Sequence, residues 1–574
     1  MNLKRLMKKF SNKLNIRSVK KCFNTSNIVF LILSILIVLL FLYPIMMIFK
    51  NGFIVDGKFT PEGYIREFTN KNTWIALLNT IKMAFGVLFI TWFLGGSLAF
   101  LVERTDYKYK KIINLFVFLS FCIPSYIISV SWIQIVSRGG YIHRILKLIY
   151  PSINYSFNTY SLLATTLVLS IHLYPLVFFG IRNALKKSSI SLNDAGRLLG
   201  GSKWHVFLKI TLPLILPSFV SVGLLVFSRT MANFGVAAQL ALPAGISVLT
   251  TGIYKAMSEL DITTQSVLSV ILILTSMSIY WVMNSYLNKR NFFFEDERKE
   301  KKHNRNIFSL GKSKVFVNVV VSIYFLLTFI LPLISLTISS FTKRWGLKLK
   351  LENLTLRNFE ILFFENEFFK RALFNSIIFG VVSSIIAVSL AVVIVYFYKT
   401  NKNRKASFIY KVASLPLAVP NIILAVGAIF AWINLPIKIY GTKWIIIFTY
   451  IMLFVPIIIK QVKGLADNID DSMDISAKTL GIPILGRIIK LFFPMIKKGV
   501  FSGIAICFLI ALREIPISLL LYAKGNETLG VMLFTIQSNA YGLEMTSAVS
   551  IIVIIISVVV NIVVKKIGVR RAGL

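Results

Sequence analysis

Long apolar runs alternate with short polar segments along the whole chain. Twelve of these runs are long enough for a helix to cross about 30 Å of hydrocarbon, which takes roughly 20 residues. They lie near 28–49, 74–102, 112–136, 161–181, 214–242, 265–287, 315–341, 373–398, 406–433, 443–462, 499–523 and 545–564. None shows the period of two expected of a membrane β-barrel strand. The pattern predicts an all-α polytopic membrane protein with about 12 transmembrane helices.

The two sets of six runs are copies of one unit. "LLNTI" (77–81) matches "LFNSI" (373–377), and "CIPSYII" (122–128) matches "AVPNIIL" (418–424), both at an offset of 296 residues. Further on, "NDAGRLLGGSKWHVFLKITLP" (193–213) matches "DISAKTLGIPILGRIIKLFFP" (474–494) at an offset of 281, so the first half has an insertion, most simply near 137–160. We predict two parallel six-helix repeats, over 1–287 and 315–574, joined by a cytoplasmic linker over 288–314.

Composition and charge agree with a membrane protein. Hydrophobic residues make up 56% of the chain, charged residues 15%, and the mean hydropathy is +0.75. The net charge of +41 could suggest a nucleic-acid partner, but Lys and Arg gather in segments on the side of the N-terminus. This asymmetry predicts that both termini lie in the cytoplasm and that the basic residues lie near lipid headgroups rather than nucleic acid. The first run is too long for a signal peptide, so we expect an uncleaved span.

Candidate chemistry for catalysis or metal binding is sparse. The cysteines (Cys22, Cys122, Cys507) and histidines (His143, His172, His205, His303) are scattered, so they predict no disulfide framework, metal site or cofactor, and each histidine is expected at a polar surface or interface. Gly196 and Gly201 are spaced as in a phosphate-binding loop, but Ser202 and Lys203 follow in the wrong order and a helix precedes them. With no nucleophile–base pair either, the chain is not predicted to be an enzyme, and any ATP hydrolysis must occur on a partner.

The stretch "SLNDAGRLL" predicts a short helix followed by a sharp turn. Ser191 and Asn193 are candidate N-caps, and Gly200 can end the helix because glycine accepts the left-handed conformation. The segment "WHVFLKI" resumes an amphipathic run, and Pro213 falls near the start of the next span. We expect a helix-turn-helix on the cytoplasmic face. A simple amphipathic linker would explain one copy but not the second at a fixed spacing.

This duplicated stretch resembles the EAA loop of ABC importer permeases, E-A-A-x-x-x-G followed by nine residues and I-x-L-P. The first copy, in a loop over 183–213, matches at Asp194, Ala195, Gly196, Gly200, Ile210, Leu212 and Pro213. The second copy, in a loop over 465–494, matches more loosely at Asp474, Ser476, Ala477, Gly481 and Pro494, with Ile475 in the acidic position. The segments 228–254 and 511–535 resemble those of fused, two-half permeases of the ferric iron importer type, which are related to thiamine, polyamine and aminoethylphosphonate permeases.

The resemblance implies a mechanism, partners and a place in the inner membrane of a bacterial cell. In such importers the short helix of each half sits on an ATPase subunit, so we expect two copies of an ABC ATPase, an extracytoplasmic substrate-binding protein and alternating access driven by ATP. Ferric iron is the implied cargo, and another small solute (thiamine, a polyamine or aminoethylphosphonate) is the alternative. An ion-coupled secondary transporter is the alternative from another class, although its loop pattern is missing from "VERTDYKYKK" (102–111).

Polar residues within the fifth span of each half form a second candidate site. They are Arg229, Asn233, Gln239, Arg513 and Glu514. A charge inside a span costs about 2.5–3.5 kcal/mol on insertion scales and usually faces the bundle interior. The offset of 281 aligns Asn233 with Glu514, so we predict that these residues line a translocation path. A structural Arg513–Glu514 ion pair and a snorkelling arginine are the alternatives, and snorkelling is expected for Lys82.

Overall fold

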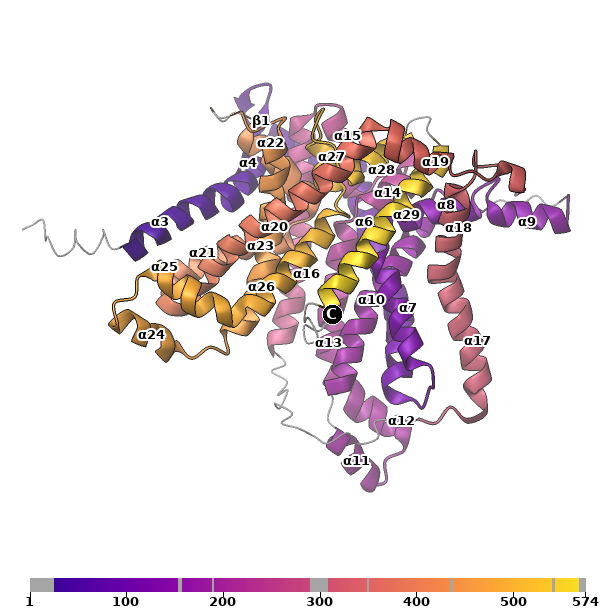
Figure 1. Cartoon of the computed structure of the whole chain (residues 1–574), viewed down its shortest axis with the longest axis horizontal. Coiled ribbons are helices and arrows are strands. Elements are labelled where there is room, and N and C mark those ends of the chain that lie inside the picture. The colour runs from indigo at the N-terminus through magenta and orange to yellow at the C-terminus, as the bar shows by residue number, and fades with distance from the viewer. Residues whose placement is uncertain are drawn as a thin grey trace, which may run out of the picture.

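The structure is a computed structural model that describes residues 25–152, 157–187, 190–289, 308–347, 350–433, 436, 438–538 and 542–566. Cys22, His303 and most of the predicted linker lie outside these residues. Nearly all of the described chain is helical (Figure 1). Ten helices in it are long and apolar enough to cross a membrane: Asn27–Asn51, Lys71–Arg104, Leu162–Lys186, Lys203–Met231, Ile262–Ile279, Gly311–Ser340, Glu367–Asn401, Lys443–Ala466, Ile484–Ala511 and Gly542–Ile562. Together with two bent spans described below, they account for the 12 predicted runs.

The first half runs from α3 to α16. Its elements are α3 (Thr25–Ile37), η1 (Val38–Leu42), α4 (Tyr43–Asn51), β1 (Ile54–Val55), β2 (Lys58–Phe59), α5 (Glu62–Thr69), α6 (Lys71–Arg104), α7 (Lys110–Cys122), α8 (Ser125–Val136), α9 (Tyr141–Ile149), α10 (Leu162–Lys187), α11 (Ile190–Leu198), α12 (Lys203–Val206), η2 (Phe207–Thr211), α13 (Leu212–Met231), α14 (Gly235–Leu240), η3 (Leu242–Ala244), α15 (Leu249–Ser258) and α16 (Ile262–Lys289). The strands β1 and β2 form a small antiparallel hairpin, with Ile54 opposite Phe59.

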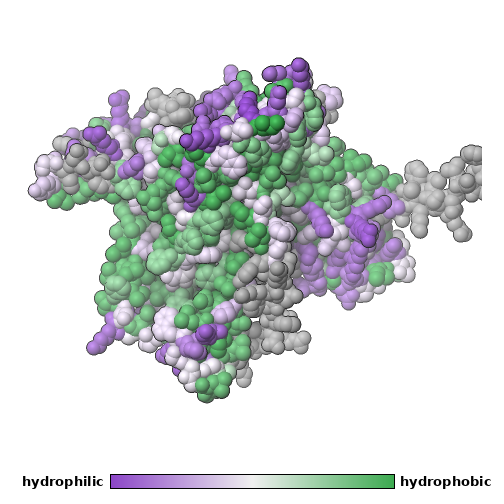
Figure 2. Space-filling model, turned by 180° about the vertical axis from the view of Figure 1, so that it is seen from behind, coloured by the Kyte–Doolittle hydropathy of each residue, from purple (hydrophilic) through white to green (hydrophobic). Residues whose placement is uncertain are grey.

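The second half repeats this order without the hairpin and without a counterpart of α9. Its elements are η4 (Gly311–Ser313), α17 (Lys314–Phe325), η5 (Leu326–Ile330), α18 (Leu331–Ser340), η6 (Leu351–Asn353), α19 (Arg357–Glu360), η7 (Ile361–Glu365), α20 (Glu367–Asn401), α21 (Arg404–Ser414), η8 (Leu415–Ala418), α22 (Asn421–Trp432), α23 (Lys443–Ala466), α24 (Asp471–Thr479), α25 (Ile484–Gly486), η9 (Arg487–Phe492), α26 (Phe493–Ala511), α27 (Pro516–Leu520), α28 (Leu529–Ser538) and α29 (Gly542–Lys566). Figure 2 shows apolar side chains over much of one face, with hydrophilic ones gathered at its edges.

The third predicted run of each half is a broken span rather than a straight helix. In the first half, the helix axis bends by 97° between α7 and the helical stretch that begins with α8. In the second half, it bends by 118° between the stretch that ends at Ala418 and the stretch that begins at Asn421. Pro124 and Pro420 stand at the breaks, and the residues before them, Ile123 and Val419, are extended. Proline lacks an N–H and disfavours helical geometry in the preceding residue, so the helix ends there.

The fifth predicted run of each half is also interrupted. The helix α13 ends at Met231 and α26 ends at Ala511, so the predicted continuous spans over 214–242 and 499–523 are wrong in their last part. In each half a short helix follows the interruption, α14 in the first and α27 in the second. In the first half, α14 to η3 and α15 form a further bent pair, at 79°.

The first span of each half packs against the other half. The helix α4 lies on α22, where a Cβ on Gly427 would lie 3.0 Å from the Pro44 carbonyl oxygen, so a larger residue would push the two helices apart by a few tenths of an ångström. In the same way α18 lies on α8, and the Ser335 hydroxyl donates to Gln134 Oε1 at 2.9 Å. Buried hydrophobic residues form two cores, and each core contains residues from both halves.

Candidate functional site

The first predicted loop forms a short helix with a sharp end. Gly200, just after α11, has a φ of +86°, and the Gly201 N–H donates to the Gly196 carbonyl at 3.0 Å. This hydrogen bond closes a Schellman motif, which satisfies a carbonyl at the helix end. A Cβ on Gly200 would meet nothing within 4 Å, so backbone conformation rather than space demands glycine. The predicted left-handed helix end is confirmed.

The predicted start of this helix is wrong. Ser191 and Asn193 lie inside α11 rather than before it, so neither is its N-cap. Asn193 is 3% exposed, and its side-chain oxygen accepts a hydrogen bond from the Thr211 hydroxyl at 2.8 Å. Asn193 therefore ties α11 to the π-helical turn η2, which leads into the next span.

The second loop repeats the first in its backbone. Gly481 has a φ of +76°, and the Ile482 N–H donates to the Ala477 carbonyl at 3.1 Å, the equivalent of the Gly201 bond at the offset of 281. A Cβ on Gly481 would also meet nothing within 4 Å. Pro213 and Pro494 stand at equivalent positions as well, each at the second position of an α-helix (α13 or α26) just after a π-helical turn. The duplication predicted from the sequence is therefore also present in the backbone structure of the two loops.

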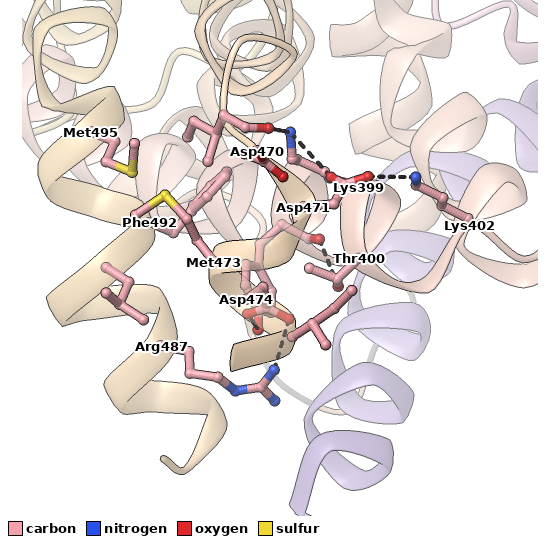
Figure 3. Close-up of a pocket in the computed structure, with 14 residues that line it drawn as sticks. Lys399, Thr400, Lys402, Asp470, Asp471, Met473, Asp474, Arg487, Phe492 and Met495 are labelled. Atoms are coloured by element: carbon pink, nitrogen blue, oxygen red, sulfur yellow. Dashed lines mark hydrogen bonds and ion pairs between the residues drawn. The ribbon is translucent and has the colours of Figure 1, made fainter. Parts of the chain in front are cut away.

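The two loops differ in how their acidic residues are used. Asp194 is exposed on α11 and forms no hydrogen bond or ion pair with any residue that the structure describes. Asp474 is engaged inside the protein, where it pairs with Arg487 Nη1 at 2.8 Å and accepts from the Tyr396 hydroxyl at 2.8 Å. Figure 3 shows Asp474 and Arg487 pointing toward each other across the pocket between α24 and η9.

Further ionic contacts hold the second loop against the membrane helices. Lys399, near the end of α20, donates to the Ala466 carbonyl at 2.6 Å. It also pairs with Asp471 at 3.4 Å (Figure 3). Lys402 also pairs with Asp471, and this hydrogen bond lowers the pKa of the Asp471 carboxyl. The helix α24 is thus anchored by charge, whereas the first-loop contact between Asn193 and Thr211 is between neutral groups.

Both loops present apolar side chains to the outside. Leu198 and Leu199 are each 89% exposed at the end of α11, and Leu480 is 79% exposed after α24. Ile475, which takes the acidic position of the second copy, is 65% exposed. The two loops project separately from the bundle (Figure 1). Exposed leucines gathered on a projecting loop are typical of a surface that binds another protein.

The aligned residues Asn233 and Glu514 have the same structural role. Asn233 Oδ1 accepts from the Val236 N–H at 3.1 Å, at the start of α14. Glu514 Oε2 accepts from the N–H groups of Ile517 and Ser518 at 2.9 and 3.1 Å, at the start of α27. Each residue therefore caps the short helix that follows the interrupted fifth span.

Their side-chain partners are also equivalent. Asn233 Nδ2 donates to the Ser125 hydroxyl at 3.2 Å, and Asn421 Nδ2 donates to Glu514 Oε1 at 3.4 Å. Ser125 and Asn421 each follow the proline of the broken third span, at the offset of 296. Sequence reasoning did not select them, although the match between "CIPSYII" and "AVPNIIL" contained the signal. These contacts join the breaks in two spans of each half.

The other predicted path residues are placed differently. Gln239 is 5% exposed and accepts from the Ser129 hydroxyl at 2.7 Å, within the first half. Arg513 Nη1 donates to the Phe121 carbonyl at 3.1 Å, so this residue of the second half reaches the first. No Arg513–Glu514 ion pair exists in the described chain, and that alternative is wrong. Arg229 lies in the last turn of α13.

The interfacial placement expected of His172 is wrong. It lies in α10, inside the span Leu162–Lys186. Its position in the middle of the apolar run 161–181 was the signal for this. His143 is also buried, at 8% exposure, whereas His205 is exposed.

The fold and these sites define a class of protein, a polytopic membrane permease of two equivalent halves with one duplicated loop on each. The family model for the binding-protein-dependent transport system inner membrane component matches residues 93–291 and 401–570, which include both loops. The chain belongs to this family.

Individual relatives match nearly the whole chain or one part of it, all at low identity. A ferric transport system permease protein FbpB of Actinobacillus pleuropneumoniae is 23% identical over 534 residues, which cover 92% of this chain and 77% of that protein. The molybdenum transport system permease protein ModB of Escherichia coli is 30% identical over 163 residues, or 28% of this chain and 69% of ModB. A solved bacterial alginate ABC transporter in complex with its alginate-bound periplasmic protein matches 46% of this chain with a TM-score of 0.35 and 16% identity.

Proposed function

We propose that this chain is the permease subunit of an ATP-binding-cassette importer for ferric iron. Its two halves would be the domains 1–287 and 315–574, and their loops over 183–213 and 465–494 would each dock on one of two copies of an ATPase. An extracytoplasmic binding protein would deliver the cargo, and both termini would lie in the cytoplasm. The main support for this proposal is the pair of matched Schellman motifs at Gly200 and Gly481, because two loops with the same backbone structure can each bind one of two identical partner subunits.

The proposed cargo rests on relatives that match nearly the whole chain and include permeases described as ferric transport proteins. Labelled ferric iron uptake should therefore depend on ATP and fall at least tenfold in cells without this gene. Restoring the gene should restore the uptake. Equal uptake with and without the gene would remove iron as the cargo while leaving the family unchanged, and thiamine, polyamines and aminoethylphosphonate would be tested next.

The proposal assigns transport to this chain and ATP hydrolysis to a partner subunit, which gives a prediction for the purified chain. We expect neither ATP binding nor ATP hydrolysis by the chain alone, because its one glycine-rich loop has its serine and lysine in the wrong order for phosphate binding. Turnover of ATP by the purified chain would be measured before and after removal of contaminating ATPases. ATP turnover that remains after this removal would contradict the proposal that a separate subunit hydrolyses ATP.

The residues that we propose for coupling are those of the two loops. Asp194, Leu198 and Leu199 are accessible on the first, whereas the second offers Ile475 and Leu480, since its Asp474 is engaged with Arg487. We infer that the acidic contact with the ATPase is made by the first loop alone. The second loop would bind through apolar contacts.

A further inference from the structure

The segment just before the second half is bound to the first half by its backbone. Phe308 forms a short parallel bridge with the turn that follows α6. Its N–H donates to the Arg104 carbonyl at 3.0 Å, and its carbonyl accepts from the Asp106 N–H at 3.3 Å. Two residues later, the Leu310 N–H donates to Asp106 Oδ1 at 2.9 Å. These bonds fix the segment next to the cytoplasmic end of α6.

The side chain of Asp106 extends this contact to the first span of the second half. Its Oδ2 pairs with Lys314 Nζ at 3.1 Å, at the start of α17, and accepts from the Ser309 hydroxyl at 3.3 Å. The hydrogen bond from the Leu310 N–H and the contacts with Lys314 lower the pKa of the Asp106 carboxyl, so it stays ionised at neutral pH. One side chain of the first half thus holds both the segment and the span that it leads into.

The ring of Phe308 lies among aromatic rings of the first loop. Its centre is 5.1 Å from the ring of Trp204 in α12 and 6.4 Å from that of Phe207 in η2. Phe100, near the end of α6, completes the group, at 5.4 Å from Phe308 and 5.1 Å from Phe207. Aromatic rings attract one another at these separations in tilted and edge-to-face arrangements. The chain before α17 therefore runs back to α12 and packs on it (Figure 1).

The helix α12 in turn supports α11, the part of the first loop that projects from the bundle. Val206 of α12 is 1% exposed. A Cβ on Gly196 would lie 3.2 Å from Val206 Cγ2 and 2.6 Å from Ile210 Cδ1, and one on Gly201 would lie 3.1 Å from Val206 Cγ2. The helix α11 is therefore packed closely on α12 and η2, and a shift of the aromatic group would move it.

The second loop is held in a different way from equivalent positions. In the second half, side chains at the end of α20 bind the aspartates of α24 directly. In the first half, Glu103 pairs with Arg182 at 2.8 Å and Asp106 pairs with Lys314. The first loop is held instead by aromatic rings, one of which, Phe308, comes from beyond the first half. At the offset of 296, the equivalent pairs are Phe100 and Tyr396, Glu103 and Lys399, and Asp106 and Lys402.

We propose that Phe308 and Asp106 form a clasp by which the second half positions the first loop for its ATPase, so that this loop and the first span of the second half move together. Phe308 is a positioning residue, which acts on the ATPase contact through Trp204 and Phe207. The inference rests on the proposed importer function for the identity of the partner, whereas the clasp itself consists of contacts within this chain.

The first test measures the loop without any partner, so that loss of the ATPase cannot cause the change. Amide hydrogen exchange is followed in the full-length permease in mild detergent. In Phe308→Ala we expect exchange over 190–211 to become roughly fivefold faster, because the loop opens locally more often. Exchange over 471–492, in the second loop, should stay as in the wild type. Asp106→Ala, which removes the other part of the clasp, should have the same effect.

The second test measures how much ATPase co-purifies with each variant. We expect at least threefold less ATPase with Phe308→Ala. Phe308→Tyr keeps the aromatic ring and should retain the ATPase as the wild type does. Phe316→Ala is the matched control, because it removes a phenylalanine of α17 that is 71% exposed, and it should retain the ATPase as well.

The outcomes separate the clasp from the proposed function. Unchanged exchange over 190–211 in both Phe308→Ala and Asp106→Ala overturns the clasp, and so does an equal rise in both loops, which would mean a general loosening of the protein. Faster exchange with full retention of the ATPase overturns the positioning role of Phe308. A wild-type chain that binds no ATPase contradicts the proposed function, while faster exchange confined to the first loop still supports the clasp.

Discussion

Replacing both Gly200 and Gly481 with valine is expected to release the permease from its ATPase and to abolish uptake that depends on ATP. Both glycines have φ values, +86° and +76°, that a β-branched residue hardly adopts. Such strain costs about 1–3 kcal/mol at each site, which corresponds to roughly a 5-fold to 150-fold loss of the docking conformation. Co-purification of the ATPase in mild detergent, together with uptake into vesicles, measures the effect.

Two other glycines provide matched controls for this variant. Gly139 has a φ of +85° and Gly441 a φ of +77°, and a Cβ on either would meet nothing within 4 Å. Gly139→Val and Gly441→Val thus impose the same backbone strain at the other end of the bundle, and the ATPase should stay bound. Full ATPase binding and uptake in the Gly200→Val, Gly481→Val variant would rule out the loops as the coupling elements.

The single variants should not be equal. In the second loop, the Asp474–Arg487 pair and the contacts of Lys399 and Lys402 with Asp471 hold α24 in place even when its end is strained. The first loop depends on the Asn193–Thr211 hydrogen bond between neutral groups. We therefore expect Gly200→Val to weaken ATPase binding more than Gly481→Val does.

Removing the caps of the interrupted spans is the second change with a large expected effect. In Glu514→Leu, the buried N–H groups of Ile517 and Ser518 lose their acceptor, which costs about 1–3 kcal/mol for each buried group left unsatisfied. In Asn233→Leu, the Val236 N–H loses its acceptor, and the Ser125 contact is lost as well. Both variants should lower the thermal unfolding temperature in detergent and reduce uptake at least tenfold.

Conservative variants distinguish the role of the side-chain oxygen as a helix cap from the role of the negative charge. Glu514→Gln and Asn233→Asp each keep a side-chain oxygen that accepts from the backbone, so we expect both to transport nearly as the wild type does. Normal uptake and stability in Glu514→Leu and Asn233→Leu would show that the caps are dispensable. A loss in Glu514→Gln equal to that in Glu514→Leu would assign the role to the negative charge instead.

The sequence predicted most of the features that depend only on residues close together along the chain. Apolar runs located the spans because a helix in lipid needs about 20 apolar residues, and each run is read without knowing its neighbours. The left-handed end at Gly200 was predicted because the preference for glycine depends on one residue's own backbone. The breaks at Pro124 and Pro420 were missed, even though the prolines were visible, because hydropathy does not respond to a missing N–H.

Some side-chain roles could not be assigned without the fold. The two loops align residue by residue, yet Asp194 contacts no described residue through a hydrogen bond or ion pair, whereas Asp474 is engaged. The partners of Asp474, Tyr396 and Arg487, come from α20 and η9. Asn193 was expected at a helix start from its preference for N-caps, but its bond to Thr211 depends on how the chain returns after the turn. A residue's local preference thus holds only when no distant partner competes for it.

By itself, the sequence determined the helical class, the two repeats and the positions of their loops, because these depend on hydrophobic patterns and turn residues within a few positions of one another. Only the tertiary structure decided that the first span of each half packs on the other half, and that Arg513 meets Phe121, 392 residues earlier in the chain. The spans have similar apolar surfaces, so their composition cannot select a neighbour. Close packing and buried hydrogen bonds make that selection, and both require residues that only the folded chain brings together.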